Sequence, residues 1–275
     1  MYQKMMPKVA GANSVACLII GDEVLGGKIQ DTNSNFLARL CFETGLSLKR
    51  ILVVPDEEED VIESVKELSA KYAHVFTSGG IGPTHDDITY DSISKAFNSS
   101  LTLHEPTIRH MERIWNKRFP NEAFVLNGGR IRMATLPIGD PASSVTFPCD
   151  DLWVPVVSVN HNVHIFPGVP TIFQQMMTSF IHDTIVPAVP GLKKYIRMEI
   201  GTNKWENEVM HVLREWQKKV QGEGVKVGSY PKAFPEKIVD PVSGVERVVN
   251  VVVSVVGTDE DGVRETIEGI KRDLE

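Results

Sequence analysis

The residues with the clearest chemical character lie between positions 77 and 91, in the sequence TSGGIGPTHDDITYD. They follow the short apolar run 72–76, a pattern typical of a buried strand. Glycines lack a Cβ atom, so a ligand phosphate can approach backbone N–H groups closely at Gly79, Gly80 and Gly82. Two adjacent acids, Asp86 and Asp87, would repel such an anion unless a metal cation lies between carboxylate and phosphate. The alternative is a tight turn with an aspartate as helix cap.

Two other predicted strands also end in acidic segments. The apolar run 14–20 leads into Asp22 and Glu23, and the run 46–54 leads into Asp56. In a parallel sheet the carboxyl ends of the strands lie at one edge, where ligands bind. We therefore expect these acids to converge on the glycine-rich segment. Two alternatives stay open, namely solvated loop acids at the first strand and a helix cap at Asp56, which stands in capping-box spacing with an acid three residues on.

Apolar periodicity predicts the elements that position these residues. Strands are expected over 14–20, 46–54 and 73–77, with helices over 32–44 and 56–70 between them. This alternation predicts an α/β fold with a doubly wound, mostly parallel sheet and right-handed crossovers. Further along the chain we expect helices over 88–97, 105–117 and 171–182, short paired strands over 153–159 and 163–166, and an irregular surface excursion over 120–152.

A proline-rich break, PAVPG at 187–191, predicts a linker between two domains. The first domain is expected over residues 1–187 and carries the candidate site. The second, over 192–275, has the pattern βαββα, which is typical of a smaller α+β domain with helices packed on one sheet face.

Composition narrows the class of protein. The net charge of −7 argues against nucleic-acid binding, which needs a basic face. No apolar stretch is long enough to span a bilayer, and the first residues lack the apolar core of a secretory signal. The three cysteines have no metal-site spacing and are expected to be reduced thiols. We therefore expect a cytoplasmic protein without a membrane or nucleic-acid partner.

Histidines and one polar segment offer weaker signals. His85, inside the glycine-rich segment, is placed to contact phosphate, whereas His161 and His164 near the expected strand pair are more typical of surface or core residues than of metal ligands. The segment 31–33, Asp-Thr-Asn, opens a helix and can serve as a cap or as part of the site.

With these residues assembled, the chain resembles the molybdopterin-binding-domain family. That family includes the MoaB and Mog proteins, CinA-type proteins and the amino-terminal domain of eukaryotic FAD synthase. The matching segments, in family order, are GDEVLGG at 21–27, DTN at 31–33, VPDE at 54–57, the segment 77–89 and FPGVP at 166–170. A further segment, VGSYP at 227–231, is similar to CinA-type proteins and the FAD synthase domain.

The resemblance implies a stand-alone counterpart of the FAD synthase amino-terminal region, with neither its FAD-synthesising domain nor the CinA-type amidohydrolase domain in these 275 residues. It implies metal-dependent hydrolysis of a dinucleotide pyrophosphate, such as FAD to FMN and AMP, with Asp56 and Asp87 as catalytic residues. Expected ligands of a divalent Mg, Mn or Co ion are Asp22, Glu23, Asp86 and Asp87. Expected substrate-binding residues are Asn33, Gly79, Gly80, Gly82, Thr84, His85, Gly168 and Pro170. Family members are commonly dimers or trimers, so a homo-oligomer is expected.

Other functions stay open at this stage. A pterin-binding or adenylating protein of molybdenum-cofactor synthesis would bind molybdopterin tightly, and a sensor would bind FAD or ADP-ribose without turnover. The sequence does not discriminate among FAD, ADP-ribose, NAD(H) and coenzyme A, because all of them contain a pyrophosphate.

Overall fold

The structure, a computed structural model, describes residues 11–239 and 246–275. The chain divides into two compact units, Met1–Leu192 and Lys193–Glu275. Each unit has its own hydrophobic core, built from the residues of its own elements. No helix in the described ranges has the length and apolar character that a bilayer crossing requires.

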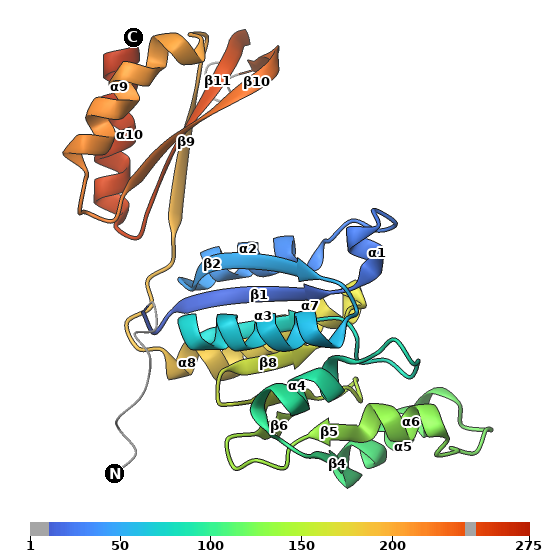
Figure 1. Ribbon diagram of the computed structural model, residues 1–275. Coiled ribbons are helices and arrows are strands. Elements are labelled where there is room, and N and C mark those ends of the chain that lie inside the picture. Colours follow the sequence, from blue (N-terminus) through green and yellow to red (C-terminus); the bar gives the residue numbers. More distant parts are fainter. Residues whose placement is uncertain (1–10, 240–245) are drawn as a thin grey trace, which may run out of the picture. The chain divides into compact units, whose positions relative to one another are not determined.

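A six-stranded sheet with strand order β2-β1-β3-β8-β7-β6 lies at the centre of the first unit (Figure 1). The strands β2, β1, β3 and β8 are parallel, whereas β7 is antiparallel to both of its neighbours. This arrangement confirms the prediction of a mostly parallel sheet, and the β7–β8 pair confirms the expected strand pair. The bounds are β1 Ser14–Ile20, β2 Ser47–Val54, β3 His74–Ser78, β6 Ser144–Thr146, β7 Val156–Val159 and β8 Val163–Phe166.

Helices cover both faces of this sheet. The chain moves from β1 to β2 in one direction along the sheet and from β2 past β1 to β3 in the other. With right-handed crossovers, the two connecting helices, α2 (Asn33–Thr44) and α3 (Glu58–Lys71), therefore lie on opposite faces. Helix α2 packs against α7 (Pro170–Phe180), and α3 packs against α4 (Thr89–Phe97). Because both faces are covered, every residue of β1 is buried, which explains its continuous apolar run.

The prediction of an irregular excursion over 120–152 is wrong in part. Residues 128–137 form a short helix and a strand, and β6 lies at the sheet edge. These elements have three to seven residues, too few for a hydrophobic period to be read. We call residues 101–137 the inserted segment. Its elements are β4 Leu101–Leu103, α5 Glu105–Arg118, α6 Gly128–Ala134 and β5 Thr135–Pro137, with β4 and β5 antiparallel.

The helix expected over 171–182 begins one residue earlier and changes form before it ends. Its α-helical part stops at Phe180, a π-helical turn η1 (Ile181–Ile185) follows, and a short helix α8 (Val186–Ala188) completes the segment. Pro187 has no N–H to donate and so cannot continue a regular helical ladder.

The second unit has the element order βαββα, with a three-stranded antiparallel sheet in the order β10-β11-β9. Its two helices cover one face of the sheet (Figure 1). Alternate residues of the central strand, Val251, Val253 and Val255, are fully buried beneath them. The bounds are β9 Ile196–Thr202, α9 Glu206–Lys219, β10 Lys226–Val239, β11 Glu246–Gly257 and α10 Glu260–Leu274.

One strand of the first unit carries a histidine in the core. His164 on β8 is 4% exposed and lies among the rings of Phe76, Phe180 and His74. Burial lowers the pKa of His164 to about 3, and it lowers the pKa of His74 as well. Both side chains are therefore neutral in the folded protein at physiological pH. The expectation of a core role is confirmed for His164, whereas His161 is exposed.

We expect His164 to make the protein sensitive to acid. In the unfolded chain a histidine gains a proton below its ordinary pKa of 6.5, whereas folded His164 stays neutral down to about 3. The unfolded state thus binds more protons as the pH falls, and the free energy of unfolding decreases over that window. Urea unfolding at about pH 7.5 and about pH 5 should show a smaller decrease for His164→Phe than for the parent. The exposed His182→Phe is the control, and an equal decrease in all three proteins would contradict this assignment.

Candidate active site

Four parallel strands end together at one edge of the sheet. Ile20 at the end of β1 is in register with Val54 of β2, and Ile19 is in register with Ser78 of β3. Ser78 is in turn in register with Phe166, the last residue of β8. The loops that follow the four strands therefore leave the sheet side by side, which the sequence predicted for the first three strands and not for β8.

The first two of these loops are joined by a hydrogen bond. The backbone N–H of Asp22, in the short helix α1 (Asp22–Leu25), donates to a carboxylate oxygen of Asp56 at 3.0 Å. Partial burial raises the pKa of the Asp56 carboxyl, and the negative charges of Asp22, Glu23 and Asp86 raise it further. Four predicted site acids thus lie close enough to interact, and Asp56 has the environment that most disfavours its charge.

The helix-cap interpretation of Asp56 is wrong. Helix α3 begins at Glu58 with Glu57 as its N-cap, and no side chain caps it. The carboxylate of Asp56 faces the preceding loop instead, because it accepts the N–H of Asp22. The capping-box spacing therefore did not indicate the partner of Asp56.

The glycine-rich loop after β3 is braced by Asp87. One oxygen of its carboxylate accepts the N–H of Gly82 at 2.6 Å, and the other accepts the N–H and the hydroxyl of Thr84 at 2.8 and 2.6 Å. These three bonds hold the loop in one conformation. Asp86, by contrast, is exposed and contributes charge at Asp56, and the exposed His85 lies at the tip of the loop.

Two of the glycines are sterically required. A Cβ atom on Gly79 would lie 2.1 Å from the carbonyl oxygen of Ile20, and its φ is +112°. Gly80 has φ of +64°, and a Cβ there would lie 2.3 Å from the hydroxyl oxygen of Thr89. The same hydroxyl donates to the carbonyl of Gly79 at 2.9 Å. The loop can therefore lie this close to β1 and α4 only because side chains are missing.

Asn33 ties the third and fourth loops to helix α2. Its side-chain amide donates to the hydroxyl of Ser78 at 2.9 Å and to the carbonyl of Gly168 at 2.8 Å. A Cβ on Gly168 would lie 3.2 Å from the Cα of Gly79, so the turn after β8 contacts the glycine-rich loop directly. The N-cap of α2 is Thr32, and Asp31 just before it accepts the N–H groups of Asn33 and Ser34 in the first turn. The carbonyl oxygen of the Asn33 side chain is buried without a partner.

The amino-terminal ends of α2, α4 and α7 all lie at this edge, because each helix directly follows one of the loops. Pro170 is the exposed first residue of α7. Helix amino termini carry partial positive charge, so their combined field favours an anion near the glycine-rich loop.

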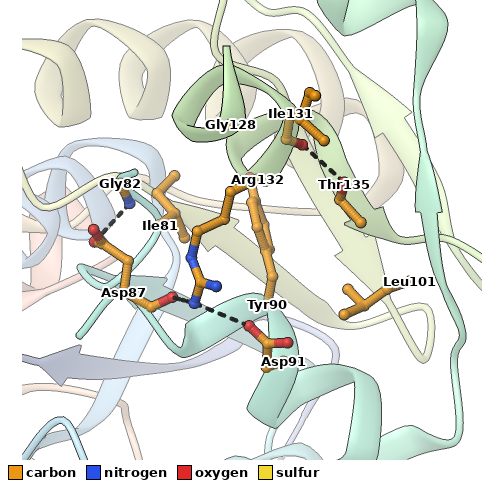
Figure 2. A pocket seen from close by; sticks show the side chains of 10 residues that line it. All are labelled: Ile81, Gly82, Asp87, Tyr90, Asp91, Leu101, Gly128, Ile131, Arg132 and Thr135. Carbon is orange, nitrogen blue, oxygen red and sulfur yellow. Dashed lines mark hydrogen bonds and ion pairs between the residues drawn. The ribbon is translucent and has the colours of Figure 1, made fainter. Parts of the chain in front are cut away.

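A cavity of about 260 Å³ lies between the glycine-rich loop and the inserted segment. Figure 2 shows Arg132 of α6 crossing it towards the loop. The guanidinium donates to the backbone carbonyl of Asp87 at 2.6 Å and pairs with Asp91 at 3.3 Å, while its Nε is buried without a partner. Apolar side chains such as Ile81, Leu101 and Ile131 form much of the rest of the wall. The lining residues are Ile81, Gly82, Asp87, Tyr90, Asp91, Leu101, Gly128, Ile131, Arg132 and Thr135.

Sequence reasoning missed Arg132, Asp91 and Ser78. No motif surrounds Arg132, which lies in the stretch expected to be irregular. Ser78 offered a signal, because it is a polar residue at the carboxyl end of an apolar strand, immediately before the glycines.

No three His, Cys, Asp or Glu side chains in the described part of the chain form a group that could hold a metal ion by themselves. Asp22, Glu23, Asp56 and Asp86 interact electrostatically but do not converge on one point. Magnesium in phosphate-transferring sites commonly takes only one or two carboxylates and completes its shell with substrate phosphates and water. The acids at this edge of the sheet fit a magnesium site of that kind, completed by substrate phosphates and water. Asp87 is not available to such a site, because its carboxylate already binds its own loop.

We expect Gly79→Ala to destabilise the first unit by about 3 kcal/mol or more, because the added Cβ collides with the backbone of β1. Gly128→Ala is the matched control, since an added Cβ there meets no atom within 4 Å. It should change the free energy of unfolding by less than about 0.5 kcal/mol. Equal effects of the two substitutions in urea unfolding would contradict the close packing of the loop.

Comparison with known proteins identifies related chains. The model of a family described as a probable molybdopterin binding domain matches residues 16–189. A protein of Caenorhabditis elegans named probable FAD synthase is 26% identical over 263 residues, which cover 90% of this chain and 50% of that protein. A CinA-like protein of Citrifermentans bemidjiense is 33% identical over 178 residues, which cover 64% of this chain and 41% of that protein.

This chain thus spans about half the length of the FAD synthase relative. Among solved structures, the protein CinA of Thermoplasma acidophilum matches with a TM-score of 0.53 and 24% identity, over 62% of this chain and 97% of that one. Its similarity supports the fold of the first unit.

Proposed function

Because this chain belongs to the molybdopterin-binding-domain family, we propose that it is a metal-dependent hydrolase that cleaves the pyrophosphate of a dinucleotide, with FAD giving FMN and AMP. The observation that carries the proposal is the group of acids around Asp56 beside the glycine-rich loop and the helix amino termini that favour an anion. These acids would repel a phosphate bound there unless a cation lies between them. A divalent metal bound together with a pyrophosphate satisfies both.

Asp56 is the group we assign to proton transfer. Burial and neighbouring charges raise its pKa, which brings a carboxylate closer to the range in which it can accept a proton from an attacking water molecule. The N–H of Asp22 holds one of its oxygens in place, so the other is left to orient the water. Asp87 acts as a positioning residue in this proposal, because both of its carboxylate oxygens accept hydrogen bonds from Gly82 and Thr84 of the loop.

The metal ion would be held by exposed carboxylates among Asp22, Glu23 and Asp86 and by phosphate oxygens. When bound, such an ion neutralises pyrophosphate charge and lowers the pKa of a coordinated water molecule. The positive ends of α2, α4 and α7 would bind the remaining phosphate charge. They lie beside the glycine-rich loop, in which the N–H groups of Gly79 and Gly82 already donate to Phe166 and Asp87. Binding of Mg²⁺, Mn²⁺ or Co²⁺ should therefore strengthen when a dinucleotide is present.

The cavity beside the loop is suited to one half of the substrate. Its volume of about 260 Å³ is smaller than that of sites which enclose a whole drug-sized ligand. Its wall combines apolar residues such as Ile81 and Leu101 with the Arg132–Asp91 pair, a surface that accepts a flat ring with polar edges. We assign a ring system of the dinucleotide to this cavity.

FAD is placed first because two relatives that match most of this chain are named probable FAD synthase. A molybdopterin ligand is the second candidate, favoured by the description of the matching family. It would use the same loop and cavity, since molybdopterin also combines a flat pterin ring with a phosphate group. Hydrolysis of FAD with release of FMN and AMP distinguishes the first candidate from the second.

The central test is incubation of the protein with FAD and Mg²⁺, Mn²⁺ or Co²⁺, with FMN fluorescence and AMP as readouts. Parallel assays with ADP-ribose, NAD and coenzyme A identify the preferred dinucleotide.

We expect Asp56→Asn to lower kcat by about 10²- to 10⁴-fold with little change in melting temperature, because it removes the proton acceptor. Asp87→Asn should instead lower the melting temperature and raise KM, because it loosens the loop. Absence of turnover by the folded parent with all three metals would refute the proposal.

A second prediction concerns the cavity. Leu101→Trp should fill part of it and change the ratio of kcat/KM between FAD and ADP-ribose at least severalfold, because only one of these substrates carries a flavin ring. Leu103→Trp is the control, since Leu103 lies two residues further on β4, is 42% exposed and does not line the cavity. The same ratio in both variants and the parent would remove this cavity from the substrate site.

A further inference from the structure

A second cavity of about 290 Å³ lies at the other end of the sheet, in the first unit. His74, the first residue of β3, lines it, whereas the glycine-rich loop follows the last residue of the same strand. The back wall is formed by buried residues of β7, β8, the end of α7 and η1, namely Ser158, His164, Phe180 and Ile185. Exposed residues, among them Ser144, His161 and Thr184, form the mouth.

The back wall contains a short chain of polar groups. The hydroxyl of Ser158 and Nδ1 of His164 are 2.8 Å apart, and Nε2 of His164 and Nδ1 of His74 are 3.4 Å apart. Both imidazoles are neutral, because burial lowers the pKa of each. A neutral imidazole has one N–H donor and one acceptor nitrogen, so the two contacts must be oriented in the same direction along the chain.

Either orientation leaves a donor at one end of the chain. If Ser158 donates to His164, then His164 donates to His74, and Nε2–H of His74 is left without a partner among these three side chains. If the direction is reversed, His74 donates to His164 and His164 donates to Ser158, whose O–H is then the spare donor. The chain therefore presents an N–H or O–H in both tautomeric states.

The surroundings of this donor favour an anion. Hydroxyl groups of Ser143, Ser144, Thr146 and Thr184 line the same cavity. Asp and Glu are absent from the described residues that line it, so no carboxylate competes for these donors or repels negative charge. The three histidines do not form a metal site either, since the described residues hold no suitable group of three ligands.

Two backbone irregularities border the cavity. The π-helical turn η1 carries Thr184 and Ile185, and such turns are often found at functional sites. On the other side, Asn160 and His161 both adopt positive φ values, +51° and +63°, in the turn between β7 and β8. The volume is several times the ~30 Å³ share of one water molecule, which leaves room for a tetrahedral anion and water.

We propose that this cavity binds a small oxyanion, either inorganic phosphate or the phosphomonoester end of a larger molecule. The spare donor, either Nε2–H of His74 or the hydroxyl of Ser158, contacts it from the back wall, and the hydroxyl of Thr184 contacts it at the mouth. This binding site is separate from the glycine-rich loop and does not depend on the proposed hydrolase activity.

The test uses the full chain and follows histidine side-chain NMR resonances during titration with inorganic phosphate and, separately, with AMP. Saturable shifts of the His74, His161 and His164 resonances are expected, with no shift of His104 and His110 in the inserted segment. Saturation by inorganic phosphate alone identifies the free ion as the ligand, and saturation only by AMP identifies the phosphomonoester. Failure of both to shift the three resonances at millimolar concentration would overturn the proposal.

Two substitutions make the test specific. His74→Phe keeps a ring in the stack and should weaken binding about tenfold or more, because it removes a donor to a charged group. Thr184→Val keeps the size of the side chain but removes its hydroxyl from the exposed mouth. It should weaken binding severalfold while the melting temperature stays unchanged. Thr178→Val, an exposed threonine of α7 outside the cavity, should bind as the parent does. Unchanged affinity in both His74→Phe and Thr184→Val would overturn the assignment of the site.

Discussion

The common end of the strands β1, β2, β3 and β8 is the constraint on which the candidate site depends. Parallel pairing brings Ile20, Val54, Ser78 and Phe166 to one edge of the sheet. The loops that follow these residues therefore begin next to one another. Side-chain and backbone contacts then join these loops in sequence: Asp22 to Asp56, Asn33 to Ser78, and Asn33 to Gly168. The site is thus built from residues that are distant in the chain and held by a rigid sheet.

Two opposing electrostatic demands meet at this edge. Three helix amino termini and a loop without side chains favour an anion, while the acids around Asp56 disfavour one. An arrangement of this kind has little value for folding, because like charges close together lower stability. It is understandable as a functional feature, since a cation together with a phosphate relieves the repulsion. Sites that carry such internal conflict are where proteins commonly depart from the most stable arrangement.

The long, periodic elements could be predicted from the sequence, and so could the proximity of Asp22, Glu23 and Asp56 at one sheet edge, because these acids follow the ends of strands that alternate with helices. The roles of individual aspartates could not. Asp56 was compatible with a helix cap or a catalytic role, and Asp87 was expected to be a catalytic residue and a metal ligand. The structure turns Asp56 towards Asp22 and Asp87 towards its own loop. Arg132 was out of reach, because α6 is too short for its period to be recognised and its partners lie about forty residues away along the chain.

The bond between Asp22 and Asp56 is made by a main-chain N–H, and this has an implication for variation in the protein. Any amino acid except proline at position 22 can supply the same donor, so the direction of the Asp56 carboxylate is inherited from the path of the polypeptide. Natural or engineered exchanges at position 22 can therefore tune the local charge while leaving that direction intact. The orientation of the Asp56 carboxylate and the local charge that acts on it can therefore be changed separately by substitution.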